Sequence, residues 1–308
     1  MNNEFLKLAE MTEDEARERV ENIRWPDGII CPKCGSDKGA YKLESKPESK
    51  NKVRPGLYKC KACRKNFTVT MGTVFEDSHI PLKKWLLAIY LMNASKKGIS
   101  AHQLHRMLDV TYKAAWFMAH RIRYAMTEKP LGQLIGTVEA DETYVGGKRR
   151  GGKRGRGSEN KTPVFALVER GGELRAGKVQ NVTGKTLKGI IRENVTPDSR
   201  IMTDQYIAYT GLNKEFAGHE TVNHGAGEYV RGDAYTNTLE GWFSMLKRGV
   251  NGTFHHVSKQ HLDRYVGEFV YRYNNREITD AERAEKAVKN IEGKRLIYKE
   301  TVNQKASN

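Results

Sequence analysis

The spacing of apolar residues changes along the chain, and each spacing predicts a different kind of element. Residues 4–22 predict one short acidic helix, and residues 81–126 carry apolar side chains at helical intervals. The first helix of the second region has apolar residues at positions i, i+3, i+4, i+7 and i+8 of one face, namely Leu82, Trp85, Leu86, Ile89 and Tyr90. From about residue 135 to residue 275, short β-branched runs alternate with helical patterns. The chain is therefore predicted to be a multidomain α/β protein.

The region 81–126 is predicted to form three helices. Ser100 and Gln103 have the spacing of a capping box that opens the second helix. Asp109-Val110 makes a turn, and Thr111 caps a third helix that runs to about Met126. A short helix, a tight turn and a longer helix form the layout of a helix-turn-helix domain, and a plain helical linker domain is the alternative.

If this region is a helix-turn-helix domain, the N-terminal residues of its last helix enter the major groove of DNA. Tyr112 and Lys113 stand at that position, and Arg121 and Arg123 are further basic residues on the same helix. We therefore expect these four residues to be DNA contacts.

The block from residue 135 to residue 275 predicts a sheet flanked by helices. Its expected elements are a strand at 135–145, a hairpin of 163–170 and 173–182 around Gly171-Gly172, a helix capped by Thr183, a strand at 200–203 ending in Asp204, a helix near 206–212, a short strand around 221–222, a helix at 237–248, and a helix from Ser258 to about Tyr273. Three antiparallel strands followed by alternating helices and strands give a ribonuclease-H-like order.

Four cysteines form two C-x-x-C pairs, Cys31 with Cys34 and Cys60 with Cys63. Two such turns supply the four thiolates of a tetrahedral zinc site, and a closed site of this kind is structural. Gly35 suits the positive-φ position that such a turn needs. We expect a zinc ribbon; two redox pairs or unpaired thiols are the alternative.

Charge narrows the class of partner. The 308 residues carry a net charge of +16 with a pI near 9.6, which indicates a polyanionic partner such as double-stranded DNA. No apolar run long enough to span a membrane and no secretory signal are visible, so we expect a cytoplasmic, nucleoid-associated bacterial protein.

Three acidic positions carry the candidate chemistry. Asp141 lies in the middle of one predicted strand, Asp204 ends another, and Glu240 lies on a later helix. Carboxylates arranged in this way can hold two Mg²⁺ or Mn²⁺ ions for phosphodiester chemistry. We expect Asp141 to be the bridging ligand. Glu139 shares its strand face and is expected to be a supporting neighbour at best, whereas Glu142 points the other way.

The helix that bears Glu240 has a polar face that includes Asn237 and Lys247. We expect Lys247 and Arg248 to touch a phosphate. A glycine-rich basic loop at 146–161 is predicted to be a phosphate-contacting arm, and a disordered linker is the alternative. Its basic candidates are Lys148, Arg149, Arg150, Lys153, Arg154 and Arg156.

The combination of these motifs resembles the insertion-sequence transposases of the DDE class, in the bacterial group with an N-terminal zinc ribbon and an ISXO2-like catalytic domain. The stretches that carry the resemblance are Arg24–Gly28, Val138–Lys148, Thr236–Gly241, Leu246–Gly249, Gly252–Ser258 and Glu268–Arg276. The chain departs from this group at Tyr235, where a His is expected. The third acidic position of such families is sometimes an Asn, so Asn237 is the second choice beside Glu240.

The resemblance implies a ribonuclease-H-like catalytic domain, metal-dependent cleavage at the ends of a mobile element, and transfer of the freed 3′-hydroxyl into target DNA. Handling two DNA ends together implies a homodimer or a higher assembly. The alternatives are a zinc-ribbon DNA-binding regulator or inactivated copy, and a ribonuclease-H-like nuclease without strand transfer. The expected domains are residues 1–78 with the zinc ribbon, 79–128 with the helix-turn-helix, 129–276 with the catalytic fold, and 277–308 as a charged tail. We expect helical character in this tail near residues 281–291, and we expect the tail to extend the fold or to contact a partner.

Overall fold

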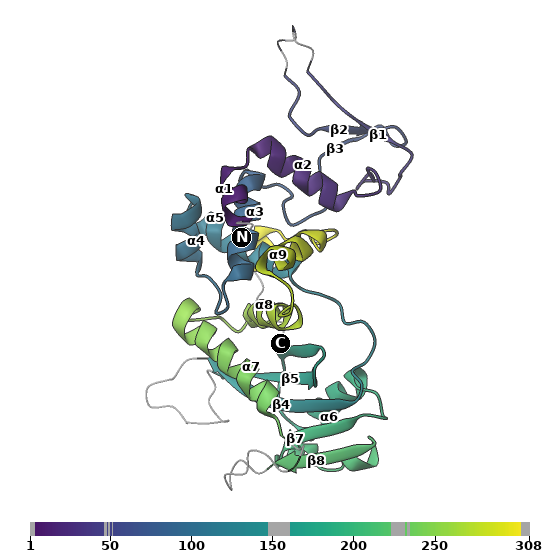
Figure 1. The fold of residues 1–308 in the computed structure, drawn as a ribbon, viewed down its shortest axis with the longest axis vertical. Helices are drawn as coiled ribbons and strands as arrows, with labels where there is room; N and C mark the ends of the chain where they lie inside the picture. The colour runs from purple at the N-terminus through teal and green to yellow at the C-terminus, as the bar shows by residue number, and fades with distance from the viewer. Residues whose placement is uncertain are drawn as a thin grey trace. The chain divides into compact units, whose positions relative to one another are not determined.

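A computed structural model describes residues 4–45, 48, 50, 52–146, 161–222, 232 and 235–302. The chain divides into two compact units (Figure 1). The first unit combines Met1–Met126 with Ile278–Gln304, and the second unit is Thr127–Glu277. Within the described ranges, no helix is both long enough and apolar enough to cross a membrane.

The N-terminal segment forms two helices, α1 (Glu4–Glu10) and α2 (Glu13–Arg24), where the sequence pattern predicted one. The chain restarts at Thr12 because Thr12 and Glu15 form a capping box. The Thr12 hydroxyl accepts the Glu15 amide at 3.3 Å, and the Glu15 carboxylate accepts the Thr12 amide at 2.7 Å. Such a box satisfies amides at a helix N-terminus and favours a new helix at this point.

A three-stranded antiparallel sheet follows, with strand order β1 (Ala40–Lys42), β2 (Tyr58–Cys60) and β3 (Asn66–Phe67). Its small core is aromatic: Trp25 meets Tyr58 and Phe67 edge-on, with ring centroids 5.7 and 6.0 Å apart. Val69 lies in a turn beyond β3 and is buried there.

Three further helices of the first unit match the predicted pattern: α3 (Leu82–Ala94), α4 (Ala101–Leu108) and α5 (Tyr112–Ala125). The Ser100 hydroxyl caps α4 by accepting the Gln103 amide, and the Thr111 hydroxyl caps α5 by accepting the Ala114 amide. Asp109 closes α4 in the left-handed conformation, with φ at 47°. These local contacts confirm the predicted caps and turn.

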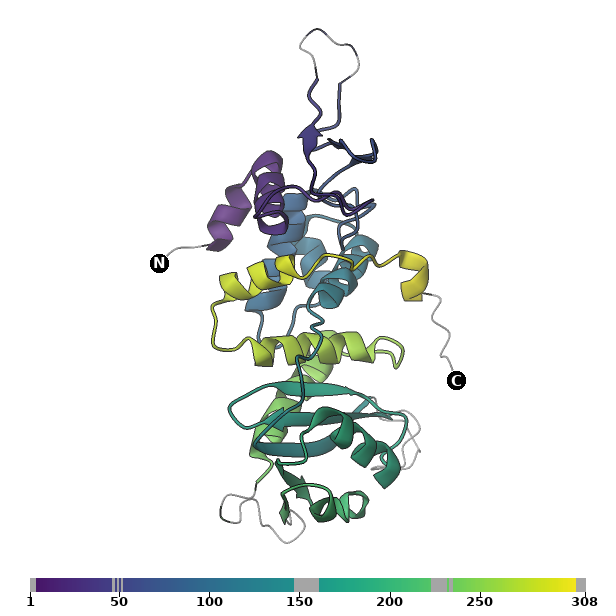
Figure 2. The ribbon, with the colours of Figure 1, turned by 90° about the vertical axis from the view of Figure 1, so that its right-hand side faces the viewer.

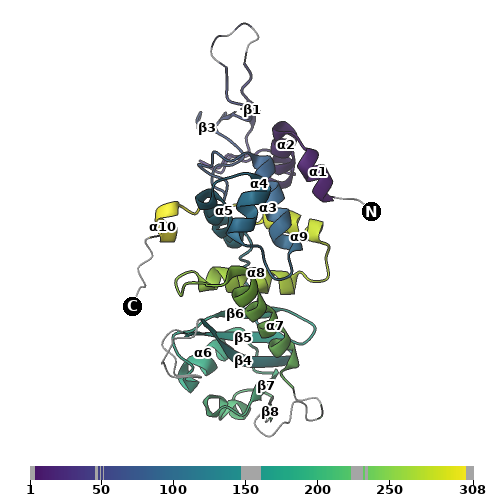
Figure 3. The same cartoon turned by 90° about the vertical axis from the view of Figure 1, so that its left-hand side faces the viewer.

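The C-terminal segment, expected to be a charged tail with helical character near residues 281–291, is helical there and belongs to the first unit. Helix α9 (Asp280–Lys289) packs against α2 and α3, and α10 (Tyr298–Val302) lies beside α5 (Figures 2 and 3). Ala287, Val288 and Ile291 are buried in this packing. Residues 278–302 therefore complete the core of the unit that the N-terminus begins, and the predicted boundary at 78/79 falls inside that unit.

The second unit is built on a five-stranded sheet with strand order β6-β5-β4-β7-β8. The strands are β4 (Thr137–Gly146), β5 (Lys161–Glu169), β6 (Leu174–Lys178), β7 (Arg200–Asp204) and β8 (Gly218–Val222). Strand β5 is antiparallel to both β4 and β6, while β7 runs parallel to β4 and β8 runs parallel to β7. Numbered along the chain, the spatial order is third, second, first, fourth, fifth, which agrees with the predicted ribonuclease-H-like order. Lys161, expected in the basic loop, is the first residue of β5.

Helices cover both faces of this sheet. Helix α6 (Gly184–Asn194) and the residues around Tyr209 pack on one face, where Val138 and Ala140 of β4 point. Helices α7 (Asn237–Arg248) and α8 (Leu262–Asn274) pack on the other face. Because side chains alternate along a strand, Glu139 and Asp141 fall on the face of α7, and Glu142 falls on the face of α6.

Two predicted helices differ in detail. The expected helix near 206–212 is two short 3₁₀ turns, η2 (Ile207–Tyr209) and η3 (Leu212–Lys214), separated by Gly211 at a φ of 92°. Ser258 does not cap α8, which begins at Leu262. A π-helical turn, η5 (Gly249–Phe254), extends α7 instead and ends at His255, whose φ is 60°. A residue in this region of φ cannot continue a right-handed helix.

Candidate functional site

The four cysteine thiols converge in the first unit. All four sulfur atoms lie within 4.8 Å of one another, and the Cys31–Cys63 and Cys34–Cys60 separations are both 3.8 Å. Zinc–sulfur bonds of about 2.3 Å in a tetrahedron place the sulfurs about 3.8 Å apart. The donor set and its spacing therefore fit a structural zinc ion, as the cysteine pattern predicted.

The turns that hold these thiols have the expected backbone. Gly35 follows the first pair with φ at 69°, and Arg64 follows the second pair with φ at 59°. The amide of Cys63 points at the sulfur of Cys60, 3.5 Å away, and lowers the pKa of the Cys60 thiol to about 7. A thiolate is the form that binds zinc, so the backbone favours the ligand state even before metal arrives.

The three acidic positions come from three different elements of the second unit. Asp141 lies within β4, Asp204 is the last residue of β7, and Glu240 lies in the first turn of α7. Strands β4 and β7 are parallel neighbours in which Glu139 pairs with Met202. Continuing that register by two residues sets Asp204 level with Asp141, so the topology brings the two aspartates to adjacent strands.

The charges of Asp204 and Glu240 both act on Asp141. Burial, together with the negative charges of Glu142, Asp204 and Glu240, raises the pKa of Asp141 to about 8. A divalent cation relieves such a cost because it neutralises the converging charges. The acids are less tightly gathered than the thiols: among the described residues, the cysteines are the group whose ligand atoms already lie at metal-binding distances.

Glu142 belongs to the opposite face, as the strand period predicted. Its carboxylate accepts a hydrogen bond of 2.7 Å from the hydroxyl of Tyr209, which is buried beside α6. Burial raises the pKa of Tyr209 well above its ordinary value, and the charge of Glu142 acts in the same direction. Glu142 is thus engaged in the α6-side core and is directed away from the face that carries Asp141.

Glu139 has more contacts than the sequence suggested. Its side chain is fully buried, and its carboxylate accepts hydrogen bonds from Arg170 and from the first turn of α7. Sequence reasoning missed Arg170 altogether and gave Glu139 a supporting role at best. The one available signal was that Glu139 and Asp141 share a strand face.

Helix α7 displays its polar residues at both ends. Asn237 is exposed at the N-terminus, Glu240 is half-buried one turn later, and Lys247 and Arg248 are exposed in the last turn. The opposite side of the helix buries Leu239, Trp242, Phe243 and Leu246 against the sheet. The helix therefore presents Glu240 from a firmly packed scaffold.

The expected DNA contacts on α5 divide into two groups. Tyr112 is 45% exposed and stacks on His102 with ring centroids 4.3 Å apart, and Lys113 is exposed with its ammonium 4.5 Å from the ring of Tyr298. Arg121 and Arg123 are only 5% and 2% exposed. Buried guanidinium groups cannot reach a phosphate, so the structure corrects the expectation for these two arginines.

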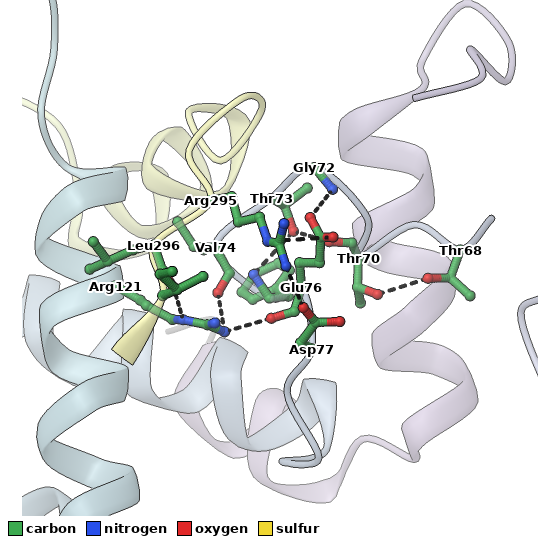
Figure 4. Close-up of polar contacts among 12 residues, drawn as sticks. Thr68, Thr70, Gly72, Thr73, Val74, Glu76, Asp77, Arg121, Arg295 and Leu296 are labelled. Atoms are coloured by element: carbon green, nitrogen blue, oxygen red, sulfur yellow. Dashed lines mark hydrogen bonds and ion pairs between the residues drawn. The ribbon is translucent and has the colours of Figure 1, made fainter. Parts of the chain in front are cut away.

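Arg121 instead joins three backbone segments (Figure 4). Its guanidinium donates hydrogen bonds to the carbonyls of Leu296, Val74 and Glu76 at 3.0, 2.9 and 2.8 Å. Arg295 adds an ion pair to Asp77 at 2.7 Å in the same region. Six other basic candidates, Lys148, Arg149, Arg150, Lys153, Arg154 and Arg156, lie outside the described residues.

Comparison with known proteins agrees with this division of the chain. Residues 11–66 match the transposase zinc-ribbon domain, and residues 133–274 match the ISXO2-like transposase domain. A relative from Halobacterium salinarum, described as an uncharacterized protein in transposable element ISH50, is 32% identical over 282 residues, which cover 85% of this chain and 91% of the relative. An uncharacterized transposase-like protein from Haemophilus influenzae is 34% identical over 100 residues, covering 32% of this chain and 80% of that protein. The chain therefore belongs to the transposase family that joins a transposase zinc ribbon to an ISXO2-like transposase domain.

Proposed function

We propose that this protein is a DDE transposase that binds the terminal repeats of an insertion sequence, cleaves DNA at the element ends and transfers the 3′-hydroxyl strand into target DNA. The observation that carries the proposal is the arrangement of three acidic residues on two adjacent strands and on the helix that covers them. Asp141 and Asp204 stand level on adjacent parallel strands, and Glu240 acts on Asp141 from the covering helix. Family membership and the basic net charge of +16 support the same function.

Carboxylate oxygens are the ligands that Mg²⁺ and Mn²⁺ prefer, so Asp141, Asp204 and Glu240 fit a pair of such ions. When bound, two ions supply a Lewis-acid clamp on the attacking and leaving oxygens of a phosphodiester. Asp141 has to release its proton to take part, because its pKa is about 8 in the metal-free protein. Lys247 and Arg248 are exposed at the end of the same helix, where they would orient the phosphate backbone.

The third ligand has two candidates on α7. We favour Glu240 over Asn237, because Glu240 carries a charge that acts on Asp141 and its side chain is half-buried at the sheet. Glu240→Gln should then abolish metal-dependent cleavage, while Asn237→Ala should leave most of it. The opposite result would assign the position to Asn237.

Recognition of the element ends would fall to the zinc ribbon and to the helix–turn–helix arrangement of α4 and α5. Tyr112 and Lys113 are exposed at the N-terminal end of α5, the part of a recognition helix that meets base edges. The basic residues between Lys148 and Arg156 would add phosphate contacts. Because two ends must be joined, we propose that the protein works as at least a dimer on double-stranded DNA, at the bacterial nucleoid.

A strand-transfer assay tests this proposal. Purified protein is mixed with Mg²⁺ or Mn²⁺, labelled DNA that carries the repeats flanking its own gene, and a plasmid target, with Asp204→Asn in parallel. Metal-dependent cut and joined products that the variant does not make are the expected result. Specific binding without cutting would indicate a DNA-binding regulator or an inactivated copy, and cutting of branched DNA without joined products would indicate a nuclease.

A further inference from the structure

The start of helix α7 is held by a side chain from a different element. Thr236 stands at the N-cap position, but its side chain makes no capping hydrogen bond. The carboxylate of Glu139, from the central strand β4, accepts the amides of Thr238 at 3.1 Å and Leu239 at 3.2 Å. These are the second and third residues of the helix, whose amides a capping side chain normally satisfies.

The other oxygen of this carboxylate is also engaged. It accepts the Thr238 hydroxyl at 2.9 Å and the Nε of Arg170 at 3.1 Å. Glu139 is fully buried, and burying a carboxylate is costly unless it is paired and hydrogen-bonded. Four donors and the positive end of the helix dipole meet that requirement. Since its oxygens are occupied by protein donors, Glu139 is poorly placed to be a metal ligand itself.

Arg170 links Glu139 to the segment that precedes α7. It lies in the turn between β5 and β6 and donates through Nη2 to the carbonyl of Tyr235 at 2.9 Å. Its guanidinium also stacks on the Tyr235 ring, 3.6 Å from the centroid. Tyr235 immediately precedes the helix cap, so Arg170 fixes the chain that enters α7 to the strand that carries Glu139.

Glu139 and the amides that it holds lie close in sequence to Asp141 on β4 and to Glu240 on α7. Glu139 precedes Asp141 by two residues on one face of β4, and the amides it holds end at Leu239, next to Glu240. We infer that Glu139, tied by Arg170, is a positioning residue that sets the distance between Asp141 and Glu240 for metal binding. This inference rests on the proposed function, because it assumes that these two acids share a metal site.

Glu139→Gln tests the inference with little change in volume. All four partners of the carboxylate are donors, so the new amide group must face at least one of them, and the anion at the helix N-terminus is lost. Glu268→Gln is the matched control. It also removes a fully buried carboxylate that is paired with an arginine, Arg272, but on α8. Thr238→Val is the milder variant, since it removes only the hydroxyl hydrogen bond and keeps both amides.

Two readouts are independent of catalysis. Hydrogen exchange followed by mass spectrometry should show the amides of Thr238 and Leu239 exchanging about tenfold faster in Glu139→Gln, as expected for the loss of a cap. Mn²⁺ titration followed by electron paramagnetic resonance should show affinity reduced about 10- to 100-fold, the usual effect of losing a residue that orients metal ligands. Glu268→Gln should change neither, and Thr238→Val should weaken Mn²⁺ binding to a smaller extent.

Each other outcome has a distinct meaning. Faster exchange with unchanged Mn²⁺ affinity in Glu139→Gln would overturn the inference, because the cap would then be structural alone. Unchanged exchange would overturn the cap itself. If the wild-type protein has no Mn²⁺ site that is lost in Asp141→Asn, the proposed function fails and the inference fails with it, while the exchange data still show separately whether Glu139 caps the helix. If Glu139→Gln does not fold, Thr238→Val decides by Mn²⁺ affinity alone: weakened binding supports the inference, and unchanged affinity overturns it.

Discussion

Replacing Arg121 with methionine should strongly destabilise the first unit, which contains the zinc ribbon, without removing a DNA contact. The guanidinium gives three hydrogen bonds of 2.8–3.0 Å to carbonyls of Leu296, Val74 and Glu76, and the side chain is 5% exposed. Methionine fills much of the same space but donates nothing. The substitution therefore isolates the loss of the donors from the loss of packing.

The size of the effect follows from two opposing contributions. Each hydrogen bond from a charged donor contributes about 1.5–3 kcal/mol, and burying the guanidinium costs several kcal/mol. The lowered pKa of Arg121, caused first by burial, reflects the second contribution. Arg121→Met leaves no buried charge, but it leaves three carbonyls without this donor, at about 1–3 kcal/mol for each, so we expect a net loss of about 3–5 kcal/mol once the relieved burial cost is subtracted. For a unit of this size that lowers Tm by about 2–4 °C for each kcal/mol, or roughly 6–20 °C in total.

Thermal unfolding followed by tryptophan fluorescence measures this change, since Trp25, Trp85 and Trp116 lie in the first unit and Trp242 in the second. Arg106→Met, an exposed arginine on α4, is the control and should shift Tm little. A Tm of Arg121→Met within about 1 °C of wild type would refute the reasoning, given the contacts above. If that variant also reduced the slope of log DNA affinity against log salt by about 1, Arg121 would be a phosphate contact after all.

Three further outcomes are expected. Asp141 has a folded pKa of about 8, raised above the value of about 3.9 expected when unfolded. Between these pH values the folded state binds one proton more than the unfolded state. In Mg²⁺-free buffer, the free energy of unfolding, compared with that of Asp141→Asn, should therefore fall as pH rises from about 4 to about 8 and level off above. Urea titrations in which the two proteins respond alike to pH would contradict this. Cys34→Ser should release the zinc, measured with a colorimetric chelator, and unfold the ribbon, because metal binding and folding are coupled in such domains; a folded, zinc-loaded variant would show that three thiolates suffice. Lys247→Ala and Arg248→Ala should each reduce the slope of log affinity against log salt by about 1; fluorescence anisotropy with an unchanged slope would remove them from the DNA interface.

Local signals in the sequence predicted a large part of this fold. The caps at Ser100, Thr111 and Thr183, the hairpin around Gly171-Gly172 and the helix at Asn237–Arg248 are all present. Each depends on residues within a few positions of one another, so a single sequence contains the necessary information. The same holds for the zinc ribbon, where cysteine spacing alone determines the site.

Contacts between distant segments explain what the sequence could not predict. Glu139 meets its partners on α7 about 100 residues later, and Arg121 meets Leu296 after 175 residues. Nothing near either residue distinguishes a buried, paired charge from an exposed one. The sequence indicated helical character in the charged C-terminal segment but not its partners, because the apolar face of α9 packs against α2, α3 and α5, which lie far away in the sequence.

The return of the C-terminus to the first unit has a consequence for synthesis on the ribosome. The carbonyl of Leu296 that completes the shell of Arg121 is translated 175 residues after it, roughly 10–35 s later at ordinary elongation rates. Until then, α3 and α5 lack their C-terminal covering, although the whole second unit has already been synthesised. A chain that lacks α9 and Leu296 is left with an unfinished first unit, which we expect to be a substrate for chaperones and proteases.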